Sequence, residues 1–148
     1  MMHRRLDVRR SEPMWEEAAF ETIETERVPT AYFLPAEEKL AIERLRAHGI
    51  VLERMERTAT LALKEFRIAA TETTAQVSEN HQERTVTGQY VALEREVPVG
   101  SYRVPMNQRL ARLAFHLLEP RSSDGLLTWN VLDEAIKRST YPIHRTRD

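Results

Sequence analysis

Cysteine is absent from the 148 residues of the chain. This absence excludes disulfides, thiol nucleophiles and zinc sites with cysteine ligands. Long apolar runs are also missing, because no segment reaches the ~18 apolar residues that a membrane-spanning helix needs. The first seven residues have no apolar segment after their basic pair, so they do not resemble a secretory signal. The sequence predicts neither a signal peptide nor a membrane span, and it leaves the compartment open.

An excess of charge of one sign is lacking as well. The 22 basic and 23 acidic side chains give a formal net charge of -1, and the two signs alternate along the chain. Such a balance attracts neither nucleic acid nor an anionic membrane, so we expect neither as a partner. Glycine is scarce and dispersed at positions 49, 88, 100 and 125, which excludes a glycine-rich phosphate loop.

The length fits a single domain with an extension before it. Residues 1–27 combine arginines and glutamates with only scattered apolar residues, so they predict a linker or N-terminal arm. An arm that holds a neighbouring domain is the alternative. Residues 28–148 are long enough to bury one sizeable core, and we predict a single mixed α/β domain there.

A β-α-β unit is predicted to begin this domain. Residues 29–35 are apolar, partly aromatic and bounded by proline, as in a short buried strand. Residues 36–48 follow with helical spacing, and Gly49 is placed to end the helix in a left-handed conformation, with Ile50 packing back. Residues 50–55 then return as a strand. Crossovers of this kind normally make their two strands parallel.

The middle of the chain has strand composition. In residues 60–70 the apolar alternation changes phase between Leu63 and Phe66, which predicts a bulge or bend. Residues 71–82 are polar and predict a loop. Residues 85–97 alternate well, and a turn at 98–100 connects them to a strand at 101–106. Strands joined so closely are expected to form an antiparallel β-hairpin.

Two helices are predicted to end the domain. Asn107 suits the N-cap of the first helix, which Pro120 ends. A second, short helix is marked by Trp129, Leu132 and Ile136, and residues 141–143 are expected to pack back as an extended tail. The predicted fold is mixed α/β with α+β character: a β-α-β unit, an antiparallel β-hairpin and two C-terminal helices.

One pair of residues has the spacing of zinc ligands. His116 and Glu119 are three residues apart, and one-metal peptidases use such a pair with a distant histidine. The pair lies within an amphipathic helix, and no second motif contains the third ligand, for which the candidates are His3, His48, His81 and His144. Neither a general base nor an arginine for a substrate carboxylate is apparent. We therefore predict no metal site and no catalytic residue, with His116 on a helix surface and Glu119 in a turn.

Two polar segments contain other residue types used in catalysis. Residues 81–84, His-Gln-Glu-Arg, lie in the predicted loop and are expected to be solvated. Residues 122–124, Ser-Ser-Asp, contain a hydroxyl without an accompanying histidine. Their short side chains are typical of helix capping, where they satisfy free backbone N–H groups.

The last third of the chain contains a long ordered motif. Residues 100–108 read GSYRVPMNQ, residues 110–115 read LARLAF, and residues 117–130 read LLEPRSSDGLLTWN. The motif resembles the C-terminal region of large bacterial zinc carboxypeptidases of the carboxypeptidase A-like family. In those proteins a strand of the form G-S-Y-x-V-x-M-x-Q leads to L-L-E-P-x-S-x-D-G-L-x-x-W. The resemblance extends over about residues 28 to 143.

The resemblance implies an accessory role. The family's zinc ligands and catalytic residues belong to a separate, preceding domain, and they correspond to no position in this chain. The chain would then hold no cofactor, the absent domain would bind the zinc, and the partner would be that peptidase domain, in cis or in trans. Within the motif, we expect Glu119 to accept backbone hydrogen bonds, Asp124 to cap the last helix, Gly125 to permit a tight turn and Trp129 to bury a large apolar area. A contact surface for the peptidase domain is the alternative role of these four residues.

Two other functions remain open from the sequence. A stand-alone peptide- or small-ligand-binding module could use the exposed edge of the hairpin. A minimal metal-dependent hydrolase would be centred on His116 and Glu119. The substrate and the oligomeric state are not encoded in any recognisable motif.

Overall fold

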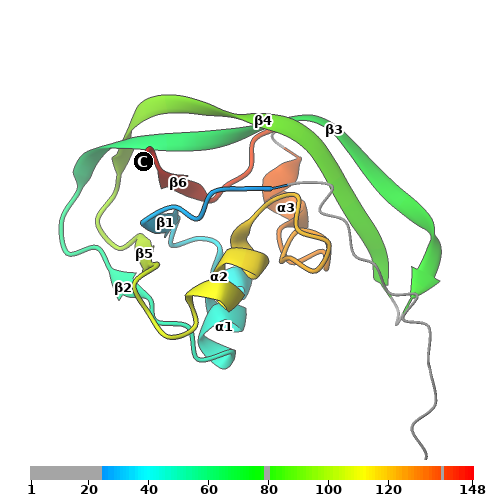
Figure 1. Cartoon of the computed structure of the whole chain (residues 1–148), viewed down its shortest axis with the longest axis horizontal. Helices are drawn as coiled ribbons and strands as arrows, with labels where there is room; N and C mark the ends of the chain where they lie inside the picture. The colour runs from blue at the N-terminus through cyan, green and yellow to red at the C-terminus, as the bar shows by residue number, and fades with distance from the viewer. Residues whose placement is uncertain (1–24, 79–80, 138) are drawn as a thin grey trace, which may run out of the picture.

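The computed structural model describes residues 25–78, 81–137 and 139–148. The described part contains a six-stranded sheet in the order β2-β5-β1-β6-β3-β4, in which every pairing is antiparallel. The helices lie together on one side of this curved sheet (Figure 1). The elements in chain order are β1 (Ala31–Leu34), α1 (Lys39–Ala47), β2 (Glu53–Arg54), β3 (Ala59–Ser78), β4 (His81–Val97), β5 (Tyr102–Pro105), α2 (Ala111–Leu118), α3 (Asp133–Ile136) and β6 (His144–Thr146). The predicted mixed α/β class is confirmed.

The first helix ends as its sequence predicts. Gly49 has a φ of 80°, a conformation that glycine adopts without strain. Its N–H donates to the carbonyl of Arg46 at 2.8 Å, and the N–H of Ile50 donates to the carbonyl of Leu45 at 3.0 Å. These are the two hydrogen bonds of a Schellman motif. Ile50 is buried and packs into the core, so the turn directs the chain back under the sheet.

The strands on either side of α1 differ from a simple crossover. β1 and β2 run in the same direction, because each is antiparallel to β5. They do not pair with each other, since β5 lies between them. The second strand is also shorter than residues 50–55, because β2 contains only Glu53 and Arg54. The predicted parallel direction of the two strands is therefore right, and a third strand lies between them.

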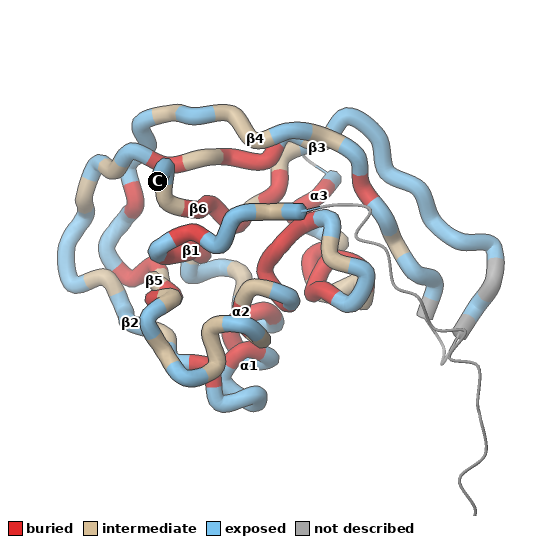
Figure 2. The backbone as a smooth tube through the Cα atoms, viewed as in Figure 1, coloured by how far each residue is buried: buried red, intermediate tan, exposed pale blue. Residues whose placement is uncertain are grey.

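The antiparallel β-hairpin is present, but it is made by β3 and β4. The sequence predicts a loop at residues 71–82. Residues 71–78 and 81–82 instead extend the two strands into a long ribbon that reaches beyond the helices (Figure 1), and residues 79–80 lie outside the described part of the chain. Thr71, Thr73 and Thr74 are β-branched and favour extended backbone even where they are exposed (Figure 2). The predicted pairing of residues 85–97 with 101–106 is wrong, since β4 lies at one edge of the sheet and β5 lies next to the other.

The change of apolar phase in β3 is not a bulge between Leu63 and Phe66. The pairing of β3 with β4 is regular from Ala59 to Ile68, and the irregularities come later, between Ile68 and Ala70 and between Thr73 and Val77. Leu63 packs on one face of the sheet in a small cluster with Ala31, Phe33 and Val97. Phe66 packs on the other face, in the main core. The phase changes because both faces of the sheet bury apolar side chains.

The C-terminus is more deeply integrated than an extended tail. Tyr141 and Ile143 are buried as expected, each with an exposed fraction of 1%. The chain then continues as β6, which lies between β1 and β3 in the middle of the sheet. The sequence prediction missed this strand because only three residues, His144–Thr146, form it.

The helices of the last third are shorter than predicted. Asn107 is not an N-cap, since α2 begins at Ala111 with Leu110 as the cap residue and no side-chain cap bond. The helix ends at Leu118, before Pro120, as predicted. The second helix, α3, is a single turn, and Trp129 lies in the turns before it. No helix in the described part of the chain has the length and apolar character needed to cross a membrane.

Candidate functional site

Glu119 is the centre of a buried polar cluster under the sheet. It follows α2, and only 5% of its surface is exposed. Its carboxylate accepts hydrogen bonds from the hydroxyls of Tyr32 at 2.5 Å and Tyr90 at 2.9 Å. It also accepts one from Nη1 of Arg145 at 3.1 Å. Both carboxylate oxygens are therefore occupied by donors from three different strands.

Arg145 connects this carboxylate to a second one. Its Nη1 also donates to Glu26 at 2.7 Å, and its guanidinium carbon lies 3.5 Å from the centroid of the Tyr90 ring. Glu26 accepts a further hydrogen bond from Arg121 at 3.1 Å. Charge-assisted hydrogen bonds of this kind are stronger than those between neutral groups. The segment before β1 is thus tied to the same cluster.

The ionisation states in the cluster follow from its burial. Burial and the neighbouring Glu119 raise the pKa of Tyr32 and of Tyr90, so both hydroxyls stay protonated and act as donors. Burial alone would lower the pKa of Arg145, but Tyr90 and the carboxylates of Glu26 and Glu119 outweigh it, and the pKa is raised. One permanent cation therefore lies between two carboxylates, which compensates the buried charge.

This arrangement holds segments together and offers no reactive group. The oxygens of Glu119 are taken by three donors, and the phenols are neutral, so the cluster contains neither a free base nor an activated nucleophile. It joins β1, β4, β6, the turn after α2 and the segment at Glu26. The prediction that Glu119 accepts backbone hydrogen bonds is wrong, because side chains donate all three. In β4 the alternation that groups Val86 with Tyr90 was a signal for an inward-facing Tyr90. No such signal indicated Tyr32, because all four residues of β1 are apolar or aromatic and buried.

A second polar cluster lies on the other face of the sheet, around Glu65. This glutamate of β3 is buried and accepts a hydrogen bond from Nη1 of Arg95 at 2.6 Å. Nε2 of His144 lies 3.3 Å from the same carboxylate oxygen, and Arg67 approaches the other at 3.6 Å. Burial and the charge of Arg95 lower the pKa of His144 more than Glu65 raises it. The lowered pKa favours the neutral imidazole, which lies between the Glu65 carboxylate and the backbone of Pro142.

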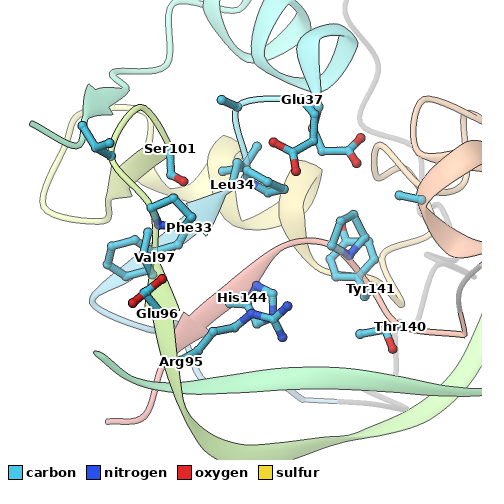
Figure 3. A pocket seen from close by; sticks show the side chains of 17 residues that line it. Phe33, Leu34, Glu37, Arg95, Glu96, Val97, Ser101, Thr140, Tyr141 and His144 are labelled. Atoms are coloured by element: carbon cyan, nitrogen blue, oxygen red, sulfur yellow. The ribbon is translucent and has the colours of Figure 1, made fainter. Parts of the chain in front are cut away.

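A cavity of about 330 Å³ adjoins this second cluster (Figure 3). It is formed where the end of β1, the turn between β4 and β5, and the segment before β6 meet. Its lining combines apolar side chains with several charged ones: Phe33, Leu34, Pro35, Ala36, Glu37, Glu38, Arg95, Glu96, Val97, Pro98, Val99, Ser101, Ala135, Thr140, Tyr141, Pro142 and His144. No sequence pattern indicates this cavity, because its walls come from distant segments.

The histidines considered as zinc ligands are dispersed. His116 is exposed on α2, whereas the carboxylate of Glu119 is buried among its three donors. His48 is exposed at the end of α1, and His144 contacts Glu65 on the opposite face of the sheet. His3 lies outside the described residues. In residues 25–78, 81–137 and 139–148 no three side chains of metal-binding type are grouped together.

The polar residues at 81–84 and 122–124 also lie differently from their predictions. Residues 81–84 are in β4 and not in a loop, and Arg84 forms an ion pair with Asp133 of α3. No helix begins at residues 122–124, where the backbone forms turns. The predicted capping role is therefore wrong for Ser122, whose hydroxyl accepts a hydrogen bond from the backbone N–H of Asp124 at 3.4 Å.

The remaining motif residues form the turns between α2 and α3. Asp124 does not cap the last helix, since α3 has no side-chain cap; its Oδ1 accepts the indole N–H of Trp129 at 2.5 Å. Trp129 is only half-buried, so it buries less apolar area than predicted. Gly125 is buried, and a Cβ there would lie 3.1 Å from Cβ of Ser122 and 3.2 Å from two backbone carbonyls. Glycine is needed at this position because of the close approach, and its φ is not positive.

Comparisons with known proteins give distant likenesses of one kind. The chain is 26% identical over 117 residues to a protein named Carboxypeptidase 2 from Trichophyton tonsurans, and 26% identical over 119 residues to one of the same name from Trichophyton equinum. A third, from Trichophyton rubrum, is 25% identical over 127 residues. No family model matches the chain. No solved structure matches it either.

These likenesses cover most of the chain and little of the relatives. They extend over 79%, 80% and 86% of the chain, but over only 22% to 23% of the relatives. The chain therefore spans less than a quarter of the length of the proteins it matches. The relatives are fungal, so the comparisons support a likeness to carboxypeptidases and not the bacterial relationship expected from the sequence. The chain is similar to a region of proteins named carboxypeptidase.

Proposed function

We propose that the chain is a non-catalytic accessory region of a zinc carboxypeptidase-like protein, which packs on the peptidase domain or modulates it, in cis or in trans. The observation that carries this proposal is the extent of the likeness to Carboxypeptidase 2 proteins, which covers 79% of this chain and 22% of the relative from Trichophyton tonsurans. A segment of that relative size leaves ample length for a separate peptidase domain. The C-terminal position and the bacterial relationship rest on the motif of residues 100–130.

The polar cluster around Glu119 supports a structural role for that motif. Glu119 belongs to the Leu-Leu-Glu-Pro part of the motif, and its oxygens are occupied by Tyr32, Tyr90 and Arg145. Arg145 in turn holds Glu26, near the end of the N-terminal segment of residues 1–27. In a domain that follows another unit, such a contact determines where the connecting segment leaves the fold. In this proposal zinc and the catalytic residues belong to the peptidase domain.

Removal of the matched segment from a relative tests the proposal. We expect Carboxypeptidase 2 from Trichophyton tonsurans without this segment to keep its zinc and to release C-terminal residues from a peptide, with a lower melting temperature. Elemental analysis and a peptidase assay measure the first two properties, and the intact protein is the control. Loss of zinc from a deletion variant that is still folded by circular dichroism would contradict the accessory role.

A binding assay tests the contact itself. The removed segment, added back in trans, is expected to associate with the shortened protein and to restore its melting temperature. The same substitution as Glu119→Gln, made in the segment of the relative if that segment has the equivalent glutamate, tests whether the polar cluster is needed for binding. A segment that folds alone and neither binds nor stabilises the remainder would argue against an accessory function.

A stand-alone peptide-binding module is the second candidate, and one observation favours it. β4 is an edge strand of 17 residues, and no strand in the described part of the chain pairs with its outer edge. Such an edge can accept an extended peptide as an additional strand. Binding of extended peptides to the isolated chain, with amide shifts confined to β4, would favour this function over the accessory one.

A further inference from the structure

The cavity beside the Glu65 cluster is separate from the cluster around Glu119 and is not explained by it. Its volume of about 330 Å³ is at the lower end of the range for small-molecule sites, about 300–1,000 Å³. Segments far apart in the chain form its walls: β1 and the turn after it, the β4–β5 turn, and residues 140–144 before β6 (Figure 3). Sites between elements that a fold holds rigidly are typical places for a ligand.

The walls of the cavity are mostly apolar and ordered. Phe33, Leu34 and Val97 have exposed fractions of 6%, 1% and 5%, and they belong to paired strands. Tyr141 lies across the cavity from Phe33 (Figure 3), and its hydroxyl is already used, since it donates to the carbonyl of Leu118 at 2.8 Å. The two aromatic residues are almost fully buried, with exposed fractions of 6% for Phe33 and 1% for Tyr141, so they close the wall of the cavity and offer no free polar group.

Ser101 provides a polar group in this wall. Only 4% of its surface is exposed, and it lines the cavity from the inner side of the β4–β5 turn, near Phe33 and Leu34 (Figure 3). Its backbone hydrogen bonds are made, but within the described part of the chain its hydroxyl has no hydrogen-bond partner. Among the described residues only Nε of Arg84 is a buried side-chain atom without a hydrogen-bond partner, so the hydroxyl of Ser101 stays accessible to solvent. A polar group of a ligand can replace water there.

The charges around the cavity favour a cation. Glu37 and Glu96 line it, and neither carboxylate forms an ion pair or a side-chain hydrogen bond with the described residues. Arg95 is the single arginine of the lining, and its charge is compensated by Glu65 at 2.6 Å. An anion would meet uncompensated carboxylates at the opening, whereas an ammonium group would be attracted to them.

We propose that this cavity binds a small organic cation with an apolar body, of the arylalkylamine class. The apolar body packs against the exposed side chain of Val99, over the wall to which Phe33 and Val97 belong. The ammonium group lies near Glu37 at the opening, and a polar group of the ligand forms a hydrogen bond with the hydroxyl of Ser101. This site does not depend on the proposed accessory function, because all of its residues belong to this chain.

Three probes of equal length separate charge from apolar contact. 4-Phenylbutylamine, 4-phenylbutanol and 4-phenylbutyrate are each titrated into the ¹⁵N-labelled chain at pH 7.5. We expect the amine to bind with shifts at the amides of Gly100, Ser101 and His144, the alcohol to bind about tenfold more weakly, and the acid not to bind. Equal binding of all three, binding of none, or shifts confined to other residues would overturn the proposal.

Matched variants test the place of binding. Val99 and Val77 are similarly exposed, at 59% and 60%, but only Val99 lines the cavity. Val99→Lys is expected to abolish amine binding by repulsion, while Val77→Lys on the distant ribbon leaves it unchanged. Glu37→Gln should weaken binding several-fold, whereas Glu72→Gln, also on the ribbon, should not. Unaltered binding to a folded Val99→Lys chain would refute the site, and circular dichroism checks the fold of each variant.

Discussion

Replacement of Glu119 by glutamine is the sharpest test of the buried cluster. The substitution keeps the size of the side chain and removes its charge. A carboxylate accepts all three hydrogen bonds from Tyr32, Tyr90 and Arg145, whereas the amide group of glutamine would turn its NH2 toward at least one of these donors. The variant therefore buries a donor against a donor and removes one of the two carboxylates that neutralise Arg145.

The size of the effect follows from these contacts. Removal of one partner of a buried ion pair typically costs about 3–5 kcal/mol. The lower end applies here, because Glu26 still pairs with Arg145 at 2.7 Å. We therefore expect Glu119→Gln to lower the free energy of unfolding by about 3 kcal/mol, a large part of the ~5–15 kcal/mol of a typical domain. With an m-value of about 2 kcal/mol/M, the urea midpoint would fall by about 1.5 M.

Urea unfolding followed by circular dichroism at pH 7.5 measures this change. The exposed Glu94 of β4 provides the control, and Glu94→Gln should change the free energy of unfolding by less than about 0.5 kcal/mol. A double-mutant cycle of Glu119→Gln with Tyr32→Phe should give a coupling energy above about 1 kcal/mol, since the two groups are in direct contact. A loss for Glu119→Gln no larger than that of the control would refute the reasoning.

Three further predictions concern His144, Gly88 and Glu26. The pKa of His144 is lowered in the fold, so the unfolded chain binds more protons, and the free energy of unfolding should fall as the pH drops below about 6.5. Urea titrations at several pH values should show a smaller dependence of this free energy on pH in His144→Gln. An unchanged dependence would contradict the prediction. In Gly88→Ala the new Cβ would lie 2.1 Å from the carbonyl oxygen of Arg67, so we expect a loss of about 2 kcal/mol or more by urea unfolding, and a neutral result would exclude this clash. Glu26→Gln weakens the ion pairs of Glu26 with Arg121 and Arg145, so trypsin should cleave after Arg27 several-fold faster while cleavage elsewhere is unchanged. Equal rates of cleavage after Arg27 in the variant and the unaltered chain would show that these ion pairs do not hold the segment.

Local signals in the sequence predicted local structure well. The end of α1 depends on Gly49 and on hydrogen bonds within five residues, and the sequence alone indicated both the cap and the burial of Ile50. The turn at residues 98–100 is similar, since Gly100 adopts a φ of 91° and the N–H of Ser101 donates to the carbonyl of Pro98. Backbone preferences of single residues determine such features, so no distant contact is needed to infer them.

Features that depend on distant contacts could not be predicted in this way. β6 has only three residues and no alternation, and its place in the sheet is set by pairing with β1 and β3, more than 75 positions earlier in the chain. The long ribbon of β3 and β4 was missed for another reason. Its distal residues are polar and exposed, so no apolar pattern distinguished them from a loop, and cross-strand pairing holds them extended.

The contacts of His116 and Glu119 likewise depend on distant segments, so the sequence could not predict them. The spacing of His116 and Glu119 indicates only that both can lie on one helix, and it contains no information on what surrounds each side chain. In the fold Glu119 has three donors and His116 is exposed, so burial separates two residues that the sequence places together. Glu119 instead meets Tyr32, which is 87 positions away. The Glu119 carboxylate holds three strands together, and through Arg145 it also reaches Glu26, so the glutamate of the Leu-Leu-Glu-Pro motif has a role in the packing of the fold.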